Sequence, residues 1–154
     1  MIKKLVIALL LPQLAGGLGA LFTTPAIPGW YAALNKPPFS PPGWLFAPVW
    51  TTLYLLMGYS FYLIWQEKPS KQRKKAIALF LIQLALNTLW SILFFGLRSP
   101  LLGLLDIMLL LFLIIFAFVS FLKINKTAGY LLFPYLLWVS FATILNFSLF
   151  LLNQ

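Results

Sequence analysis

The sequence contains no cysteine and no histidine, and its only carboxylates are Glu67 and Asp106. The missing thiols and imidazoles exclude disulfides, thiolate catalysis, zinc sites and histidine-ligated haem. General acid–base catalysis usually needs more than one well-placed titratable group, for which this chain offers almost no material. We therefore expect no metal site, no cofactor and no hydrolytic chemistry from these residues.

Charge is also scarce, whereas apolar residues are abundant. Hydrophobic residues make up 62% of the 154 residues and charged residues only 8%, with a mean hydropathy of +0.98. About a quarter of the residues of a soluble domain are charged. The net charge of +9 comes from short basic runs between apolar segments, without any nucleic-acid-binding motif. These features predict an integral membrane protein that does not bind nucleic acid.

Charges and prolines divide the chain into five apolar spans: residues 5–24, 43–65, 76–96, 101–122 and 130–152. At 1.5 Å per residue, helices of these lengths can cross about 30 Å of hydrocarbon. We predict an all-α membrane protein, a bundle of five transmembrane helices forming one domain over residues 1–154. Lys3 and Lys4 resemble the start of a signal peptide, but the apolar run that follows is longer than a typical signal core and has no A-x-A site. We therefore expect the first span to be a packed helix.

The basic residues are distributed unequally between the two sides of such a bundle. Only Lys36 and Arg98 fall on the side of the C-terminus. The side of the N-terminus has Lys3, Lys4, Lys68, Lys71, Arg73, Lys74, Lys75, Lys123 and Lys126. By the positive-inside rule, we expect a multi-pass protein of the cell membrane with a cytoplasmic N-terminus and an external C-terminus.

The linker 25–42 combines six prolines with Trp30, Tyr31 and Phe39. Disordered linkers contain few aromatic residues, so this composition favours an ordered lid over the external end of the bundle. The alternative is that these rings form an aromatic belt at the membrane surface.

Four of the spans contain stripes of aromatic, small and amide side chains at the spacing i, i+4, i+7, i+11, which places them on one helix face. The stripes are Gln13, Gly17, Ala20 and Thr24; Phe46, Trp50, Tyr54, Met57 and Phe61; Gln83, Asn87, Trp90 and Phe94; and Tyr135, Trp138, Ala142 and Asn146. Amides in hydrocarbon need partners and should face inward. They could form a slot for a flat ligand with polar edges, or a hydrogen-bond network that holds the helices together. The positions of Trp50 and Trp138 in mid-span favour the ligand interpretation, because Trp usually prefers the membrane interface.

Asp106 is the one acid inside a span, and such residues are functional candidates by default. A single acid without a carboxylate partner gives little support to a proton-coupled pump. We expect a structural role for Asp106, with its charge compensated by Arg98, by an indole N–H or by protonation.

Motifs spread along the chain resemble the tryptophan-rich sensory protein family, whose mitochondrial members are the translocator proteins, or peripheral-type benzodiazepine receptors. The motifs include Trp30-Tyr31, Lys36-Pro37, Pro41-Pro42, Ala47-Pro48-Val49-Trp50, Met57-Gly58-Tyr59, Gln83-Leu84-Ala85-Leu86-Asn87, Trp90, Asp106, Pro134-Tyr135-Leu136, Trp138 and Leu145-Asn146. They occur in the same order over nearly the whole chain.

This resemblance implies a homodimeric five-helix bundle with a cavity roofed by the first loop, which binds porphyrins and synthetic aromatic ligands. By position, the cavity would be lined by Ala47, Trp50, Asn87, Trp90, Trp138 and Ala142, under a lid containing Trp30. The stripes add Phe46, Tyr54, Gln83 and Asn146 as candidate ligand-binding residues. Animal members carry a Tyr-Arg pair near the end of the fifth helix, proposed as a cholesterol motif. Here the tail 146–154 has no basic residue, so sterol binding is not expected.

Three functions follow as hypotheses. The first is a membrane receptor for protoporphyrin-like tetrapyrroles, in which Trp50 and Trp138 would also assist breakdown of the porphyrin by light and oxygen. The second is transport of porphyrin or another amphipathic molecule, although the sequence lacks the inverted repeat common in transporters. The third is a stress-response protein whose ligand controls a partner that docks on residues 68–75.

Overall fold

The computed structural model describes all residues 1–154, and every regular element in it is a helix. The five long helices are α1 (Ile2–Ala26), α2 (Phe46–Gln66), α3 (Lys71–Ser91), α4 (Pro100–Ile124) and α5 (Lys126–Leu152). Short π-helical segments, Ile27–Tyr31 and Ile92–Gly96, extend α1 and α3, and a 3-10 turn at Gly43–Leu45 precedes α2. The predicted all-α class is confirmed.

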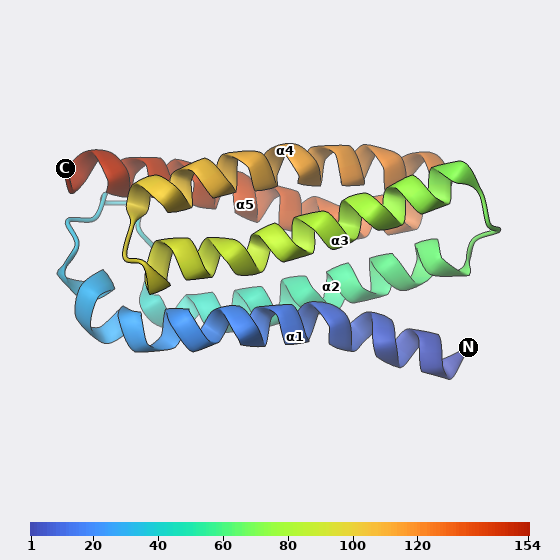
Figure 1. Cartoon of the computed structure of the whole chain (residues 1–154), viewed down its shortest axis with the longest axis horizontal. Coiled ribbons are helices and arrows are strands. Elements are labelled where there is room, and N and C mark those ends of the chain that lie inside the picture. Colours follow the sequence, from blue (N-terminus) through green and yellow to red (C-terminus); the bar gives the residue numbers. More distant parts are fainter.

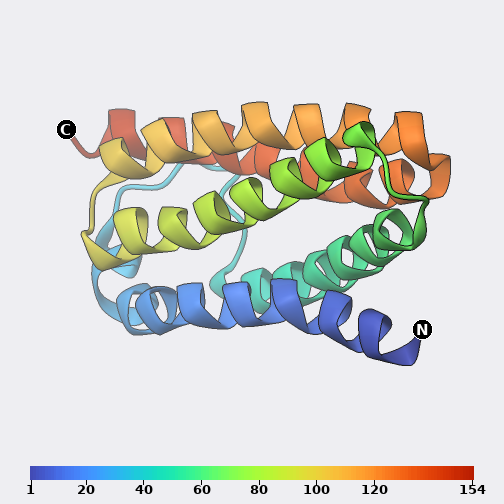
Figure 2. The same cartoon turned by 45° about the vertical axis from the view of Figure 1, so that its right-hand side comes forward.

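The helices run back and forth along the long axis of the molecule (Figures 1 and 2). α1 packs beside α2, and α4 packs beside α5, while α3 lies between the two pairs and contacts both α1 and α4. α2 also packs against α5, which closes the bundle. The two termini lie at opposite ends of the bundle (Figure 1).

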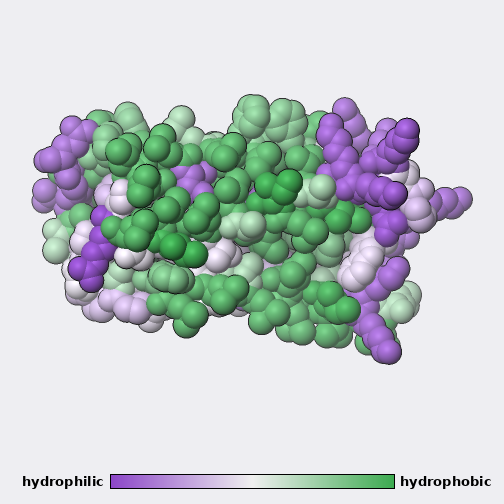
Figure 3. Space-filling view, viewed as in Figure 1, coloured by the Kyte–Doolittle hydropathy of each residue, from purple (hydrophilic) through white to green (hydrophobic).

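Four of the helices are long and apolar enough to cross a membrane: α1 and α3 with their π-helical extensions, α4 and α5. α2 has 21 residues but is less hydropathic, because it contains Trp, Tyr, Thr and Ser among its apolar residues. On the face drawn in Figure 3, an apolar belt covers the middle of the molecule, and hydrophilic residues gather at its ends. This surface is typical of a helical bundle that resides in lipid.

Side-chain caps set where three helices begin. Ser70 Oγ accepts a 3.0 Å hydrogen bond from the Arg73 backbone N–H, and Asn125 Oδ1 accepts one of 3.1 Å from the Ala128 N–H. At the start of α4, Ser99 caps the helix and Pro100 occupies its first position. The predicted starts at residues 76 and 130 are therefore too late. Helices α3 and α5 include the charged residues after their caps, which an apolar-span criterion leaves out.

The linker is shorter than predicted, because helical backbone continues from α1 through Ala33. Pro28 lies in the π-helical segment, where a widened turn accommodates the missing N–H and the bulk of the ring. The remaining segment is bonded to the end of α5. The Asn35 N–H donates to Asn153 Oδ1, and Asn153 Nδ2 donates to the Asn35 carbonyl, each at 2.9 Å.

In the half of the bundle near the N-terminus, stacked aromatic rings and a close contact between two helices pack the core. The rings of Phe61 and Phe80 stack with centroids 4.7 Å apart, and Phe80 stacks on Phe121 at 6.0 Å. A Cβ atom added at Gly58 would lie 2.6 Å from the Ala8 carbonyl oxygen, so this glycine allows α1 and α2 to approach closely. The aromatic-lined pocket of the molecule lies in the opposite half.

Candidate functional site

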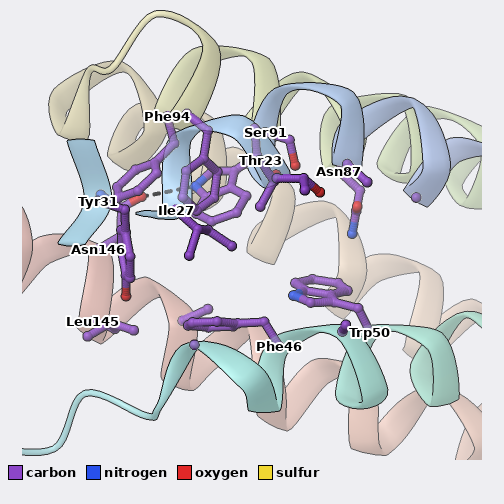
Figure 4. Close-up of a pocket in the computed structure, with 18 of the residues that line it drawn as sticks. Thr23, Ile27, Tyr31, Phe46, Trp50, Asn87, Ser91, Phe94, Leu145 and Asn146 are labelled. Carbon is purple, nitrogen blue, oxygen red and sulfur yellow. Dashed lines mark hydrogen bonds between the residues drawn. The ribbon is translucent and has the colours of Figure 1, made fainter. Parts of the chain in front are cut away.

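A pocket lies between α1, α2, α3 and α5 in the half of the bundle near the C-terminus, with a cavity volume of about 190 Å³. Its lining comes from the C-terminal halves of α1, α3 and α5 and from the N-terminal half of α2. Figure 4 shows Phe46 and Trp50 on α2 facing Thr23, Ser91 and Asn87 across the pocket. The lining residues Ala20 and Thr24 on α1 and Gly43 and Ala47 near the start of α2 are also exposed, so the pocket reaches the surface between these two helices.

Aromatic rings form most of the pocket wall. Trp50 stacks on Tyr54 with centroids 5.5 Å apart, and Trp90 stacks on Phe94 at 5.1 Å. Phe46 meets Trp138 edge to face at 6.4 Å. Because each ring is supported by a neighbouring ring, the wall is a fixed surface with exposed π faces.

The polar floor of the pocket is a chain of hydrogen bonds between three helices. Tyr54 Oη donates to Asn87 Oδ1 at 2.8 Å, Asn87 Nδ2 donates to Tyr135 Oη at 2.9 Å, and Tyr135 donates to Gln83 Oε1 at 2.7 Å. These four side chains are buried. The chain joins α2, α3 and α5 in a medium that offers no water to replace a lost partner.

The other amides are bonded between helices as well. Trp90 Nε1 donates to Asn146 Oδ1 at 3.0 Å, and Asn146 Nδ2 donates to the Pro100 carbonyl at 2.9 Å. Gln13 Nε2 donates to the Thr51 carbonyl at 3.0 Å and joins α1 to α2. The amide side chains therefore form interhelical hydrogen bonds, and two of them, Asn87 and Asn146, also line the pocket.

Two polar atoms of pocket residues are buried without a hydrogen-bond partner: Tyr31 Oη and Trp138 Nε1. A buried donor without a partner is costly and is rare in native proteins. Both side chains line the pocket, but these two atoms have almost no accessible surface, so a ligand acceptor reaches them only if neighbouring side chains shift.

Asp106 is buried in α4 and does not line the pocket. Its Oδ2 atom has no hydrogen-bond partner. The expectation that Arg98 or an indole N–H compensates it is therefore wrong for this oxygen. Arg98 instead lies in the turn between α3 and α4 and has a positive φ of 53°.

The structure brings nine of the predicted ligand-binding residues to the pocket: Phe46, Ala47, Trp50, Tyr54, Asn87, Trp90, Trp138, Ala142 and Asn146. Trp30 does not line it. The Trp30 ring packs edge to face against Phe94 and Phe95, with centroids 5.4 and 6.3 Å apart, so it supports the wall from behind. Gln83 also lies outside the lining, where it accepts the bond from Tyr135.

Sequence reasoning missed one wall of the pocket, which α1 and its extension provide. The lining residues Gly16, Ala20, Thr23, Ile27 and Tyr31 follow the spacing of a single helix face. Of the lining residues on α1, Ala20 and Thr24 belonged to the predicted stripe. Ile27 and Tyr31 were missed because the helix was expected to end at residue 24, and Gly16 and Thr23 because each precedes a stripe residue by one position.

The fold and pocket define a helical membrane protein with a cavity lined by aromatic side chains between its helices. The chain belongs to the TspO/MBR family, whose model matches residues 8–152. It is 46% identical to the tryptophan-rich protein TspO of Archaeoglobus fulgidus over 99% of this chain and 98% of the relative. It is 42% identical to the translocator protein of Bos taurus over 94% of this chain and 87% of the relative. It is also 39% identical to the tryptophan-rich sensory protein of Cereibacter sphaeroides over 80% of this chain and 77% of the relative.

Proposed function

We propose that this protein is a membrane receptor that binds a protoporphyrin-like tetrapyrrole in the aromatic pocket. The observation that carries the proposal is the pocket wall itself, in which ring faces accompany the unpartnered donors Tyr31 Oη and Trp138 Nε1. A planar ring system with acceptor groups at its edge complements both features. Trp50, Trp90 and Trp138 provide the faces against which it stacks.

The size of the cavity determines how such a ligand lies. An apolar cavity of about 150 Å³ holds a single benzene ring, so about 190 Å³ cannot enclose a tetrapyrrole. Part of the macrocycle therefore lies in the opening between α1 and α2, where Ala20 and Ala47 are exposed. Small side chains at this place leave room for a flat edge.

We propose that α2 is the fifth membrane crossing and that the N-terminus is cytoplasmic. α2 packs along both α1 and α5, and its 21 residues extend about 32 Å at 1.5 Å per residue. Trp50 and Tyr54 lower its hydropathy but face partners inside the bundle. The nine cations at the end of the N-terminus favour the cytoplasmic side for that end.

The proposal extends to light-dependent breakdown of the bound porphyrin by dioxygen. The porphyrin absorbs the light and supplies the reactive centre, so the protein needs only to orient it and exchange electrons with it. Trp50 and Trp138 lie on the pocket wall in positions to do so. Replacing both with Phe should slow product formation more than it weakens dark binding.

Titration with protoporphyrin in the dark, followed by tryptophan fluorescence in detergent, tests the receptor proposal. We expect saturable quenching that weakens in the double variant Trp50→Phe/Trp138→Phe. The matched control is Trp44→Phe/Trp65→Phe, which removes two indoles outside the pocket lining and should leave the affinity unchanged. Non-saturable quenching that is equal in all three proteins would mean that porphyrin only partitions into the micelle.

Transport is the second candidate function, and the opening between α1 and α2 is the observation that favours it. Flux of porphyrin into sealed proteoliposomes separates transport from binding. A homodimer, which the family resemblance implies, is tested by measuring the mass of the protein–detergent complex.

A further inference from the structure

The end of the bundle where α1 begins, α2 ends and α3 begins is strongly basic. Nine cations lie at this end: Lys3, Lys4, Lys68, Lys71, Arg73, Lys74, Lys75, Lys123 and Lys126. The one acid among them is Glu67, whose Oε1 atom accepts a 2.9 Å hydrogen bond from Asn125. Hydrophilic side chains cover this end, at the right of Figure 3, directly beside the apolar belt.

Two of these cations converge on one residue, Trp65, near the end of α2. Lys4 Nζ lies 5.5 Å from the centroid of a Trp65 ring. Arg73 Nη2 donates a 3.0 Å hydrogen bond to the Trp65 carbonyl. Arg73 is half-buried, and its Nε atom is buried without a hydrogen-bond partner.

This arrangement leaves donor capacity that no protein acceptor uses. A guanidinium has five N–H donors in a planar fork that matches the oxygens of a phosphate, and an ammonium beside it adds a point charge. The hydrogen bond from Arg73 Nη2 to the Trp65 carbonyl fixes the position of the guanidinium group, but the Arg73 Nε–H has no acceptor. Lys4 contacts the ring of Trp65 and Arg73 its carbonyl, and an anion bound beside this residue would reduce the repulsion between the two cations.

We propose that Lys4, Trp65 and Arg73 form a binding site for the phosphate of an anionic phospholipid. The location favours a lipid over free phosphate, because Trp65 is the second-last residue of the apolar helix α2, and the ends of membrane helices are the level at which indole rings meet headgroups. Lys4 Nζ and the Nη donors of Arg73 that the Trp65 carbonyl does not use bind the phosphate oxygens, and the acyl chains continue along the apolar belt. Anionic lipids are attracted to basic clusters at this depth in general, and the convergence on Trp65 makes this cluster a defined site.

The test measures phospholipid retained by the full-length protein after purification from vesicles of equal phosphatidylglycerol and phosphatidylcholine, by native mass spectrometry. The wild-type protein should retain phosphatidylglycerol selectively. The variant Lys4→Gln/Arg73→Gln should lose about thirtyfold in selectivity, as expected for removing two cations at a headgroup. The control Lys123→Gln/Lys126→Gln makes the same change in net charge at the same end and should keep the selectivity.

Equal losses in the two double variants would overturn the proposal, since they would mean that lipid responds only to net charge. Displacement of phosphatidylglycerol by inorganic phosphate at physiological ionic strength would also overturn it, in favour of a free-anion site. Thermal unfolding of each variant shows whether a loss of lipid binding comes from a folding defect. Added phosphatidylglycerol should raise the Tm of the wild type and the control, but not that of Lys4→Gln/Arg73→Gln.

Discussion

The phenol of Tyr54 on α2 donates a 2.8 Å hydrogen bond to the amide oxygen of Asn87 on α3, and both side chains line the pocket. Asn87 passes the connection to Tyr135 on α5. The floor of the pocket is thus the same set of atoms that holds three helices in register. Changes to this floor should alter stability and ligand binding together, whereas changes to the pocket wall can separate them.

Tyr54→Phe should destabilise the protein by about 1–3 kcal/mol, because it removes the donor and leaves Asn87 Oδ1 buried without this partner. Reversible unfolding in mixed micelles measures the effect. Tyr59→Phe is the control, since the half-exposed Tyr59 lies on the same helix and makes no side-chain hydrogen bond within the chain. Similar stabilities for the two variants would contradict a structural role for the Tyr54–Asn87 bond.

Gly58→Ala should destabilise the bundle by about 1–3 kcal/mol, because the new methyl group would meet the backbone of α1 at Ala8 and Leu9. Backbone atoms cannot turn aside as a side chain can, so α1 must move away from α2. Gly17→Ala is the matched control. A Cβ at Gly17 has no neighbour within 4 Å, so this change should be neutral or stabilise by about 0.5–1 kcal/mol. Thermal unfolding of both variants decides the matter, and a neutral Gly58→Ala would refute the close helix contact.

Trp138→Phe should have opposite consequences for the free and the ligand-bound protein. In the free protein it removes a buried N–H that has no partner, which offsets part of the cost of the smaller ring. In the complex it removes a donor to the ligand, so the affinity for porphyrin should fall about tenfold. Calorimetric unfolding without ligand and dark titration with ligand measure the two effects. A variant that melts much lower yet binds porphyrin normally would show that the indole serves only for packing.

Asp106→Asn should leave stability unchanged or raise it, because the wild-type protein buries a carboxyl oxygen without a hydrogen-bond partner. Porphyrin affinity should not change, since Asp106 does not line the pocket. Both quantities can be measured on one purified sample. A loss of about 3–5 kcal/mol would instead reveal a buried partner that depends on the charge.

The sequence predicts the helical bundle well, because charged residues are costly inside lipid and therefore fall between the apolar runs. Periodicity also identifies the polar faces, and Asn87, Trp90 and Asn146 all lie where their stripes place them. Periodicity shows which face of a helix a residue occupies, but not how deep in the bundle that residue lies. Gln83 shares a face with Asn87, yet it lies one turn deeper, below the pocket floor.

The errors have a common physical origin in how helices end. Pro25 and Pro28 suggested the end of the first helix, but a π-helical turn carries the chain past them. Ile27 and Tyr31 consequently join the pocket, while Trp30 is turned toward Phe94 and Phe95. The unpartnered state of Trp138 Nε1 could not be predicted either, because it depends on distances between helices that are remote in sequence.

The aromatic pocket of this bundle lies in one half, while the stacked rings of Phe61, Phe80 and Phe121 lie in the other. Pressure favours states of smaller volume, and empty space inside a protein is the main volume that can be eliminated. Compression should therefore act unevenly, closing or hydrating the pocket half before it disturbs the aromatic stack. A ligand that fills the pocket would make the two halves respond to pressure more equally. The difference in compressibility between the halves therefore measures how much of the protein has ligand bound, without an optical signal from the ligand.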